Sequence, residues 1–433
     1  MLEDLIKKIP GMEVSEDGSI THNGKTISKI TIDGKTFFLN DPQIATKNLP
    51  AKIVDKLKVI EKKSDQAEFT GIDDGEEETI LDLTVKPGMM KGSFGNLMGG
   101  GGHDIPSTSV EGDWRFQTAG FLGNFTDNYQ ISAVLNANNT NNRGFNDLAG
   151  SMMGGMRGGG MGRGQGGWGG GNGITTSYMA GVNGGTNLFD GKMDISGNGM
   201  FNHSSKSVIE DSFKETRLDD SSLLYDSEGN SNTQTLGAGF GMRLEHKFSE
   251  NTSIIFEPKL NFGGGSFADS ENTLTRTLNY DNPADTLNTN RSSSLQSGNN
   301  RSLSTSGVVL LRQKLGIPGR TLTLMGNYNI SRNRIFDALN QSNTITYDSE
   351  GNENGNTPVN HSYKQESNST TLFATATFTQ PLAEKLFAEV NASYSWSESN
   401  SDKFTYDNLN GGALVDSYSN DIYNHFTSET TGA

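Results

Sequence analysis

The sequence contains no cysteine and no long apolar run, and its basic residues are in the minority. Without cysteine, the 433 residues can form neither a disulfide framework nor a thiolate metal site. No stretch of about 18 apolar residues occurs, which excludes a transmembrane helix. Acidic residues (51) outnumber Lys and Arg (35), and the net charge of −16 argues against nucleic acid as a partner.

The start of the chain also lacks the features of a secretory signal peptide. Residues 1–14, MLEDLIKKIPGMEV, show no basic start followed by an apolar stretch and a small-residue cleavage site. Two explanations stay open: the protein remains in the cytoplasm, or the chain begins inside a longer protein. Hydrophobic residues make up only 32% of the chain, but they are ordered into alternating runs, which is not typical of a disordered protein.

Residues 1 to about 87 have the pattern of a compact α+β unit. Apolar side chains at helical spacing predict a short helix near the start, ended by a Pro-Gly pair. Asn23-Gly24 and Asp33-Gly34 predict tight turns between short strands. Asp41-Pro42 predicts a second helix start, and another helix is expected from about Pro50 into KLKVIEKK. TILDLTVKP predicts a closing strand.

From about residue 91 the helical period is replaced by alternating apolar and polar residues in pairs of long runs. KGSFGN predicts a first strand, and short polar turns join the following runs into hairpins. The predicted hairpins pair 114–125 with 129–139, 174–188 with 192–201, 235–247 with 252–262, 303–315 with 321–330, and 371–378 with 386–397. These are 11 strands, and DIYNHF near the end predicts the start of a twelfth.

The remaining connections are long and rich in Asn, Ser, Asp and Gly, so loops are predicted there. Their ranges are 140–173, 202–233, 264–301, 331–367 and 398–420. Long loops that alternate with tight turns are awkward in a compact soluble domain. They are typical of a barrel that crosses a membrane. A soluble antiparallel sandwich or a β-helix explains the alternation of any one strand equally well, but neither explains this regular order of connections.

The two faces of the predicted strands favour a membrane on one side. Leu236, Phe240 and Leu244 fall on the face opposite Arg243 and Glu245, because successive side chains of a strand alternate. Each apolar face spans about ten residues, the length of a tilted strand that crosses the hydrocarbon.

The stretch LFAEVNASYSWSES, 386–399, follows the same rule. Its residues Leu386 to Ala392 are expected to face lipid, with Tyr394 and Trp396 at the interface. The predicted fold class is therefore mainly β, a small α+β domain followed by the antiparallel transmembrane strands of an incomplete β-barrel.

The first hundred residues resemble a known family. LIKKIPGMEVSEDGSITHNGKTISKITIDGK resembles the opening of the plug domain of TonB-dependent outer-membrane transporters. The continuation, FFLNDPQIATKNLPAKIVDKLKVIEKKSDQAEFTGIDDGEEETILDLTVKPG, is similar to the branch with a carboxypeptidase-regulatory-like domain upstream. KGSFGN resembles the first barrel strand of that branch, and GSMMGGMRGGGMGRGQGGWGGGNG resembles a loop that its members often carry.

This resemblance implies a plug domain at 1–88 and the N-terminal half of an outer-membrane β-barrel at 89–433, with about 11–12 strands and long extracellular loops. Such barrels have about 22 strands and enclose the plug. A fragment cut at both ends is therefore expected, with the signal peptide, the regulatory-like domain and the TonB-contacting segment before Met1. A closed 12-strand barrel is the alternative, although its interior would have little room for a plug of nearly 90 residues.

The function that the resemblance implies is uptake of an unidentified ligand through a plugged barrel in the cell outer membrane. The implied partners are outer-membrane lipid, a TonB-type energy-transducing protein and the ligand. A movable plug is expected to make polar, wet contacts with the wall. Alternation places the following polar residues on the inner face: Arg243, Glu245, Glu257, Lys259 and Asn391. Two alternatives stay open: a non-transporting barrel whose loops bind surface polymers or partner proteins, and a soluble β-rich secreted protein.

Local motifs give little support for chemistry. The acidic stretch IDDGEEE, 72–78, lacks the ligand spacing of a calcium loop and is predicted to be a solvated turn. The segment 150–173 has 14 Gly but no phosphate-binding pattern, and is predicted to be a flexible loop in which Arg157, Arg163 and Trp168 are candidate ligand contacts. The six histidines are scattered, and no nucleophile elbow occurs. We therefore expect no catalytic residue, no cofactor and no metal, and a protein that is not an enzyme.

Overall fold

The computed structural model describes most of the chain in separate ranges. These are residues 2–15, 19–32, 35–36, 46, 51, 54–63, 67, 69, 77–86, 92–105, 113–126, 128–141, 173–279, 286–383, 386–408, 415–416 and 422–432. Within these ranges the fold is mainly β, with one short helix and three sheets, so the predicted fold class is confirmed. No helix in this part of the chain is long and apolar enough to cross a bilayer.

The described residues from 2 to 86, which we call the N-terminal unit, form one helix and two small sheets. Their bounds are α1 Leu2–Ile6, β1 Met12–Val14, β2 Ile20–His22, β3 Lys25–Thr26, β4 Lys29–Ile32, β5 Lys35–Thr36, β6 Val54–Lys63 and β7 Glu77–Val85. The first three strands form one sheet, and the second sheet has the order β5-β4-β7-β6, with β4 and β7 parallel. Apolar side chains from both sheets and from α1 are fully buried together, including Leu2, Ile30 and Leu81.

The predicted helix at the start and the predicted closing strand are both found, as α1 and β7. The helix predicted from Pro50 into KLKVIEKK is wrong, because Val54–Lys63 is the strand β6. Leu57 and Val59 pack on the buried core while Lys58 between them is exposed, so this segment uses a period of two. The helix start predicted at Asp41-Pro42 lies outside the described residues.

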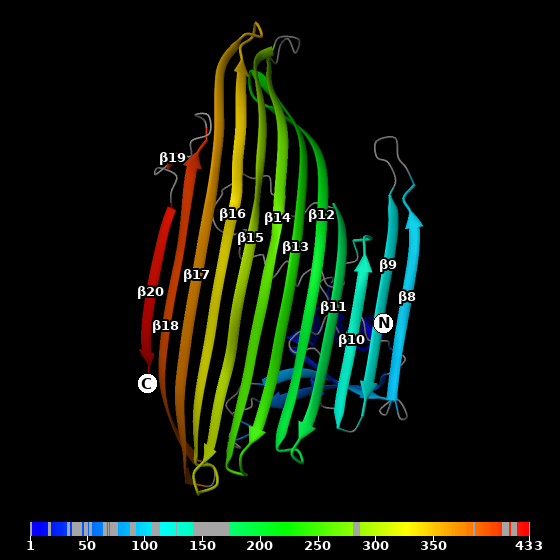
Figure 1. Ribbon diagram of the computed structural model, residues 1–433, viewed down its shortest axis with the longest axis vertical. Coiled ribbons are helices and arrows are strands. Elements are labelled where there is room, and N and C mark those ends of the chain that lie inside the picture. The colour runs from blue at the N-terminus through cyan, green and yellow to red at the C-terminus, as the bar shows by residue number, and fades with distance from the viewer. Residues whose placement is uncertain are drawn as a thin grey trace.

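The rest of the chain forms one large antiparallel sheet of 13 strands (Figure 1). Its strands are β8 Gly92–His103, β9 Trp114–Phe125, β10 Tyr129–Asn138, β11 Ile174–Leu188, β12 Met193–Arg217, β13 Ser221–Lys247, β14 Thr252–Asn279, β15 Thr286–Lys314, β16 Thr321–Tyr347, β17 Glu353–Ala383, β18 Leu386–Asp407, β19 Val415–Asp416 and β20 Ile422–Gly432. From β8 to β18 each strand pairs with the next one in sequence. β19 and β20 both pair with β18.

The long loops predicted from β12 onward are wrong in most of their length. The ranges 202–217 and 221–233 belong to β12 and β13, which continue as a paired hairpin to a turn at 218–220. The ranges 264–279, 286–301, 331–347, 353–367 and 398–407 are likewise strand. These segments are polar on both faces, so they lack the apolar alternation that predicts a strand, and backbone pairing extends the sheet through them.

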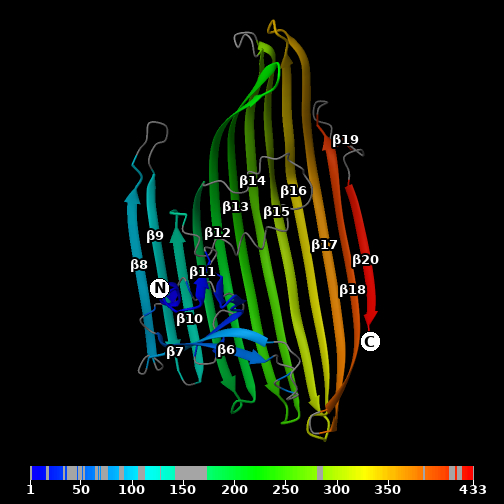
Figure 2. The ribbon, with the colours of Figure 1, turned by 180° about the vertical axis from the view of Figure 1, so that it is seen from behind.

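The N-terminal unit covers one face of the large sheet, close to the end where short turns join the strands (Figure 2). We call the covered face the inner face and the opposite one the outer face. In β10, Gln130, Ser132 and Val134 are buried on the inner face. Ile131 and Leu135, at the alternate positions, are exposed on the outer face. The pairing registers carry this alternation across the sheet from strand to strand.

Tight turns and a bulge in β16 are among the features that fix these registers. The turn between β11 and β12 has three consecutive residues with positive φ, Phe189 (54°), Asp190 (54°) and Gly191 (81°), as a sharp reversal requires. In β16 the register shifts between Ile335 and Ala338 relative to β17, and Asp337 between them has φ 50°. One extra residue in β16 therefore forms a β-bulge.

The sheet does not close on itself within the described residues. β8 pairs only with β9, and β20 pairs only with β18, so each leaves one edge without a partner strand in this part of the chain. The described strands therefore form an open, barrel-like wall with the N-terminal unit against its inner face.

The continuous pairing beyond residue 264 gives a test. Ser293 lies in the middle of β15. It pairs with Asn272 of β14 on one side and with Asn343 of β16 on the other. Ser293→Pro removes a ladder donor, so we expect amide hydrogen exchange in the adjacent strands to accelerate about ten-fold, the equivalent of one hydrogen bond. Ser293→Ala is the matched control and should leave exchange unchanged. Equal exchange in both variants would mean that this segment is a loop.

Candidate functional site

The outer face of the large sheet carries a band without charge. From β13 to β18, its outer-face positions at 236–244, 252–262, 303–313, 322–330, 370–378 and 388–396 include no Asp, Glu, Lys or Arg. Several large apolar side chains in this band are 40–65% exposed, among them Phe240, Leu324 and Val390. A contiguous exposed apolar surface of this extent is rare on a water-soluble protein.

The dimensions of this apolar band fit a bilayer. Ten residues of an antiparallel strand measure about 34 Å, and a tilt of roughly 40° reduces that to about 26 Å across the membrane. The upper limit of the band also moves down the strands in steps, from Leu236 on β13 to Trp396 on β18. It stays in one row where Phe262 pairs with Leu303 and where Ile330 pairs with Thr370. A band at a slant to the strands is what tilted strands require.

On the inner face, the N-terminal unit makes a dry apolar contact with β9–β12. The buried cluster of the unit continues into the wall through five side chains: Phe121, Phe125, Val134, Met179 and Met200. Burying one such side chain stabilises the contact by about 1.5–3 kcal/mol. Gln130 Nε2 also donates to the backbone oxygen of Ile32 at 3.1 Å in this buried region. The expectation that the contacts are polar and wet throughout is therefore wrong for this part of the wall.

Further along the inner face, β13–β15 carry a network of charges. Arg243 forms ion pairs with Glu257 and, at 3.3 Å, with Glu245. Arg312, whose side chain is 6% exposed, donates to Glu245 at 2.9 Å and to Ser253 Oγ at 3.0 Å. The strands place these groups together because Arg243 lies between the pairs 241↔259 and 244↔256, opposite Glu257, and 253 pairs with 312 on the same face.

One residue of the N-terminal unit contacts this charged region. The guanidinium of Arg312 lies 4.9 Å from the ring centroid of Phe69, and Lys314 Nζ lies 5.0 Å from it. Both distances are within the range of cation–π attraction. The unit is therefore held by an apolar contact over β9–β12 and by a cationic contact over β15. We call these the apolar contact and the ionic contact.

The residues predicted on the inner face share that face, but not all of them meet. Arg243, Glu245 and Glu257 form the network described above. Lys259 is exposed and has no ion pair among the described residues. Asn391 lies on β18, away from the network, and donates to Glu389 at 2.9 Å. Sequence reasoning missed Arg312, which lies on the inner face of β15 opposite Ser253.

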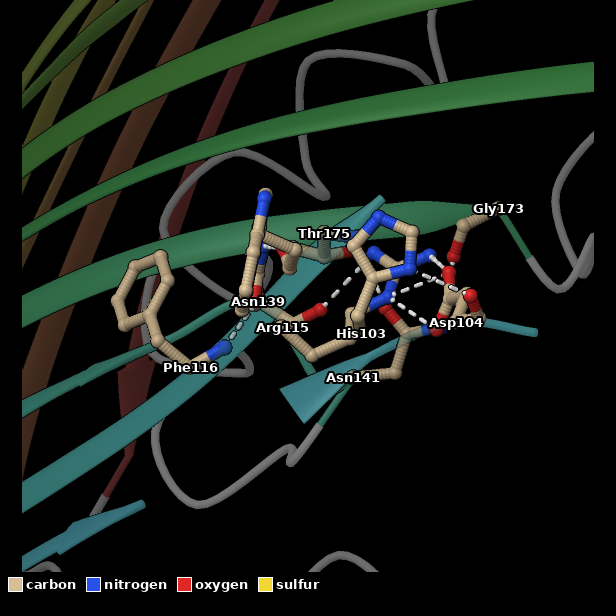
Figure 3. A network of polar contacts seen from close by, with 9 residues as sticks. His103, Asp104, Arg115, Phe116, Asn139, Asn141, Gly173 and Thr175 are labelled. Atoms are coloured by element: carbon tan, nitrogen blue, oxygen red, sulfur yellow. Dashed lines mark hydrogen bonds and ion pairs between the residues drawn. The ribbon is translucent and has the colours of Figure 1, made fainter. Parts of the chain in front are cut away.

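At the far end of β8–β11, a polar clasp closes the base of the long connection between β10 and β11 (Figure 3). Arg115 donates to both carboxylate oxygens of Asp104, at 2.9 Å from Nε, and to the backbone oxygen of Asn139 at 3.3 Å. Asn141 joins the two ends of the connection, donating to Gly173 O at 2.9 Å and accepting from Thr175 N at 2.8 Å.

The clasp fixes the points where the Gly-rich connection leaves and re-enters the sheet. The candidate ligand contacts Arg157, Arg163 and Trp168 lie in that connection, outside the described residues. Most of the acidic stretch 72–78 also lies outside them. Within the described ranges, no three His, Asp or Glu side chains gather into a group that could hold a metal ion.

Comparisons with known proteins give limited information. No family model matches the chain, and no curated protein matches it in sequence. Among solved structures, the siderophore receptor PirA from Pseudomonas aeruginosa aligns over 99% of this chain and 96% of its own, with 9% identity and a TM-score of 0.24. The ferric enterobactin receptor PfeA from the same organism aligns over 99% and 96%, with 10% identity and a TM-score of 0.24.

A third similar structure is the pyoverdine outer membrane receptor FpvA from Pseudomonas aeruginosa PAO1. It aligns over 98% of this chain and 78% of its own, with 9% identity and a TM-score of 0.23. At TM-scores this low, these alignments carry no argument about fold, ligand or function.

The ionic contact gives a test on the strength of attachment. Phe69→Leu removes the ring that Arg312 and Lys314 approach, so we expect the free energy that holds the N-terminal unit to fall by about 1 kcal/mol. The measurement is the urea concentration at which a protease releases residues 1–86. Glu389→Gln, on β18, is the control and should not shift it. An unshifted midpoint for both variants would contradict a role of the ionic contact in attachment.

The clasp gives a pH-dependent test. The hydrogen bonds from Arg115 hold the pKa of the Asp104 carboxyl below its ordinary value of 3.8. Because the pKa is lowered in the folded state, the ion pair stabilises the clasp fully above that value and is lost as the pH falls through the lowered pKa. We expect Asp104→Asn to accelerate hydrogen exchange at 115–118 and 137–141 at neutral pH.

In the unsubstituted protein, the same segments should lose protection only in strong acid. Asp113→Asn is the matched control, because Asp113 contributes to this region through its backbone oxygen, which accepts from Asp104 N at 2.9 Å. If Asp113→Asn accelerates exchange as much as Asp104→Asn does, the carboxylate of Asp104 is not the group that holds the clasp.

Proposed function

We propose that this chain acts in the cell outer membrane as a TonB-dependent receptor or transporter-like protein, which takes up an unidentified ligand through a plugged β-barrel. The observation that carries the proposal is the uncharged band on the outer face, whose height suits one bilayer. The resemblance of residues 1–100 to plug domains supports it independently. The proposal assigns no reaction, cofactor or metal to the chain.

In this proposal residues 1–88 are the plug and residues 89–433 are barrel wall. Each backbone N–H and C=O in lipid must be paired within the sheet, so a wall in the membrane has to close. The edges of β8 and β20 then pair with each other or with further strands. The short turns between β9 and β18 face the periplasm, and the long hairpins from β12 to β17 extend beyond the outer surface.

The two contacts of the N-terminal unit suggest how a path opens. A TonB-type protein that pulls on the unit acts against the weaker contact first. The ionic contact consists of two cations beside a single ring, worth about 0.5–2 kcal/mol each, whereas the apolar contact must expose several buried Phe and Met side chains to water. The unit therefore swings away from β13–β15 and stays attached at β9–β12, and the ligand passes along the charged side.

A second function is supported by a different observation. Beyond the apolar band, β12–β17 continue for a further ten residues or more as a paired sheet rich in Asn, Ser and Thr. A wide polar sheet outside the membrane is suited to adhesion to surface polymers or partner proteins, without any transport.

Cross-linking distinguishes the two functions. Because the chain has no cysteine, introduced pairs are the only reactive thiols. We expect mild urea to induce a potassium current through the protein in planar bilayers. A bis-maleimide bridge between Phe69→Cys and Lys314→Cys, across the ionic contact, should abolish that current. A bridge between Ile32→Cys and Gln130→Cys, across the apolar contact, is the matched control and should leave the current intact.

The outcomes separate cleanly. Current blocked by the first bridge alone supports a plug that opens on its charged side. Current blocked by both bridges contradicts the hinge at the apolar contact. The absence of any current in unbridged protein, with polymer binding intact, favours the adhesive function and overturns transport.

A further inference from the structure

A hollow of about 720 Å³ lies on the large sheet where β14–β18 leave the apolar band. Most of the residues that line it occupy strand positions whose side chains lie on the outer face. Its charged members are Arg301, Arg332, Arg334, Glu366 and Glu398. The lining also includes residues at inner-face positions, such as Ser331, which alternate along the strands with the outer-face ones. The hollow therefore opens on the outer face, away from the N-terminal unit.

The registers give its height. Phe262 pairs with Leu303, and Leu303 pairs with Arg332. Arg332 of β16 therefore lies at the same height as the last apolar residues of β14 and β15. In the next row outward, Arg301 pairs with Arg334. If the uncharged band lies in the hydrocarbon, these three guanidinium groups lie at the depth of the lipid headgroups, on the side where the long hairpins extend.

The charges of the hollow are only partly balanced. Arg334 forms an ion pair with Glu366 at 3.2 Å, and both side chains are more than half exposed. Arg301 lies over the ring of Phe336, 5.2 Å from its centroid, which positions the guanidinium without neutralising it. Arg332 is exposed and has no ion pair among the described residues, and Glu398 lies two strands away on β18. Two arginines are thus available to an anion.

We propose that this hollow binds the phosphate group of an anionic lipid in the outer leaflet, with Arg301 and Arg332 as its ligands. This inference rests on the proposed membrane location. Guanidinium groups recognise phosphate through paired, charge-assisted hydrogen bonds. The exposed rings and methyl groups of Phe262 and Leu303 lie beside the acyl chain, so one site contacts both parts of the lipid. A basic cluster at headgroup depth attracts anionic lipid in this way.

The experiment uses the full chain in nanodiscs of phosphatidylcholine doped with phosphatidic acid, and native mass spectrometry counts the lipids retained. Each arginine near a membrane surface contributes about 1 kcal/mol, or roughly five-fold in affinity. We expect Arg301→Gln with Arg332→Gln to lower the retention of phosphatidic acid by roughly 25-fold. Arg291→Gln is the matched control, because Arg291 is exposed on the same strand and has the same parity, ten residues before Arg301.

Membrane insertion is measured separately on spin labels. A label at Leu324→Cys on the outer face should be relaxed by dissolved oxygen, and one at Asn329→Cys on the inner face by a water-soluble nickel complex. Equal response of the two labels overturns the membrane proposal itself. Normal insertion with equal retention of phosphatidic acid and phosphatidylcholine overturns the lipid site alone.

Two further outcomes also decide the matter. If inorganic phosphate displaces phosphatidic acid as readily as added phosphatidic acid does, the hollow is a site for free anions and the lipid proposal fails. If Arg291→Gln weakens retention as much as the double variant does, the effect is general surface charge and the proposal fails. Loss confined to the Arg301 and Arg332 variant supports it.

Discussion

Backbone hydrogen bonding between neighbouring strands is the constraint on which the rest of this structure depends. Pairing fixes the register, the register fixes which side chains share a face, and a shift of one residue would exchange the two faces. The outer band without charge, the inner charged network and the hollow with its arginines are all consequences of one continuous set of registers from β8 to β18. Which face a side chain occupies is therefore decided by its odd or even position along the strand more than by any local motif.

Alternation allowed the sequence to predict the strands near the band, because one face there is apolar and the other polar. It failed above the band, where runs such as 202–233 are polar on both faces and so have the composition of loops. The segment 54–63 was predicted as a helix because its Lys, Leu, Ile and Glu residues favour helices, yet pairing with β7 and the burial of Leu57 and Val59 make it a strand. Local preference lost to tertiary contact in both cases.

The candidate site was predicted in part for a similar reason. Arg243, Glu245 and Glu257 were assigned to the inner face by alternation, and the register brings them together. No pattern in the sequence could show that Arg312, some 67 residues after Glu245, completes the network, because that contact requires the order β13-β14-β15. The apolar contact was missed because it joins the N-terminal unit to residues such as Phe121 that sequence alone assigns only to a strand. The result is a unit attached by two contacts of opposite character.

The bulge in β16 limits how this wall can change in evolution. Its extra residue at Asp337 reverses the odd–even assignment of every position that follows in that strand, so Ala338 is buried on the inner side where unbroken alternation would turn it outward. Insertions or deletions of two residues within the paired part of the strand preserve which face each side chain lies on, whereas a change of one residue reverses it unless a second bulge cancels the shift. Length variation among related walls is therefore expected to occur in even steps.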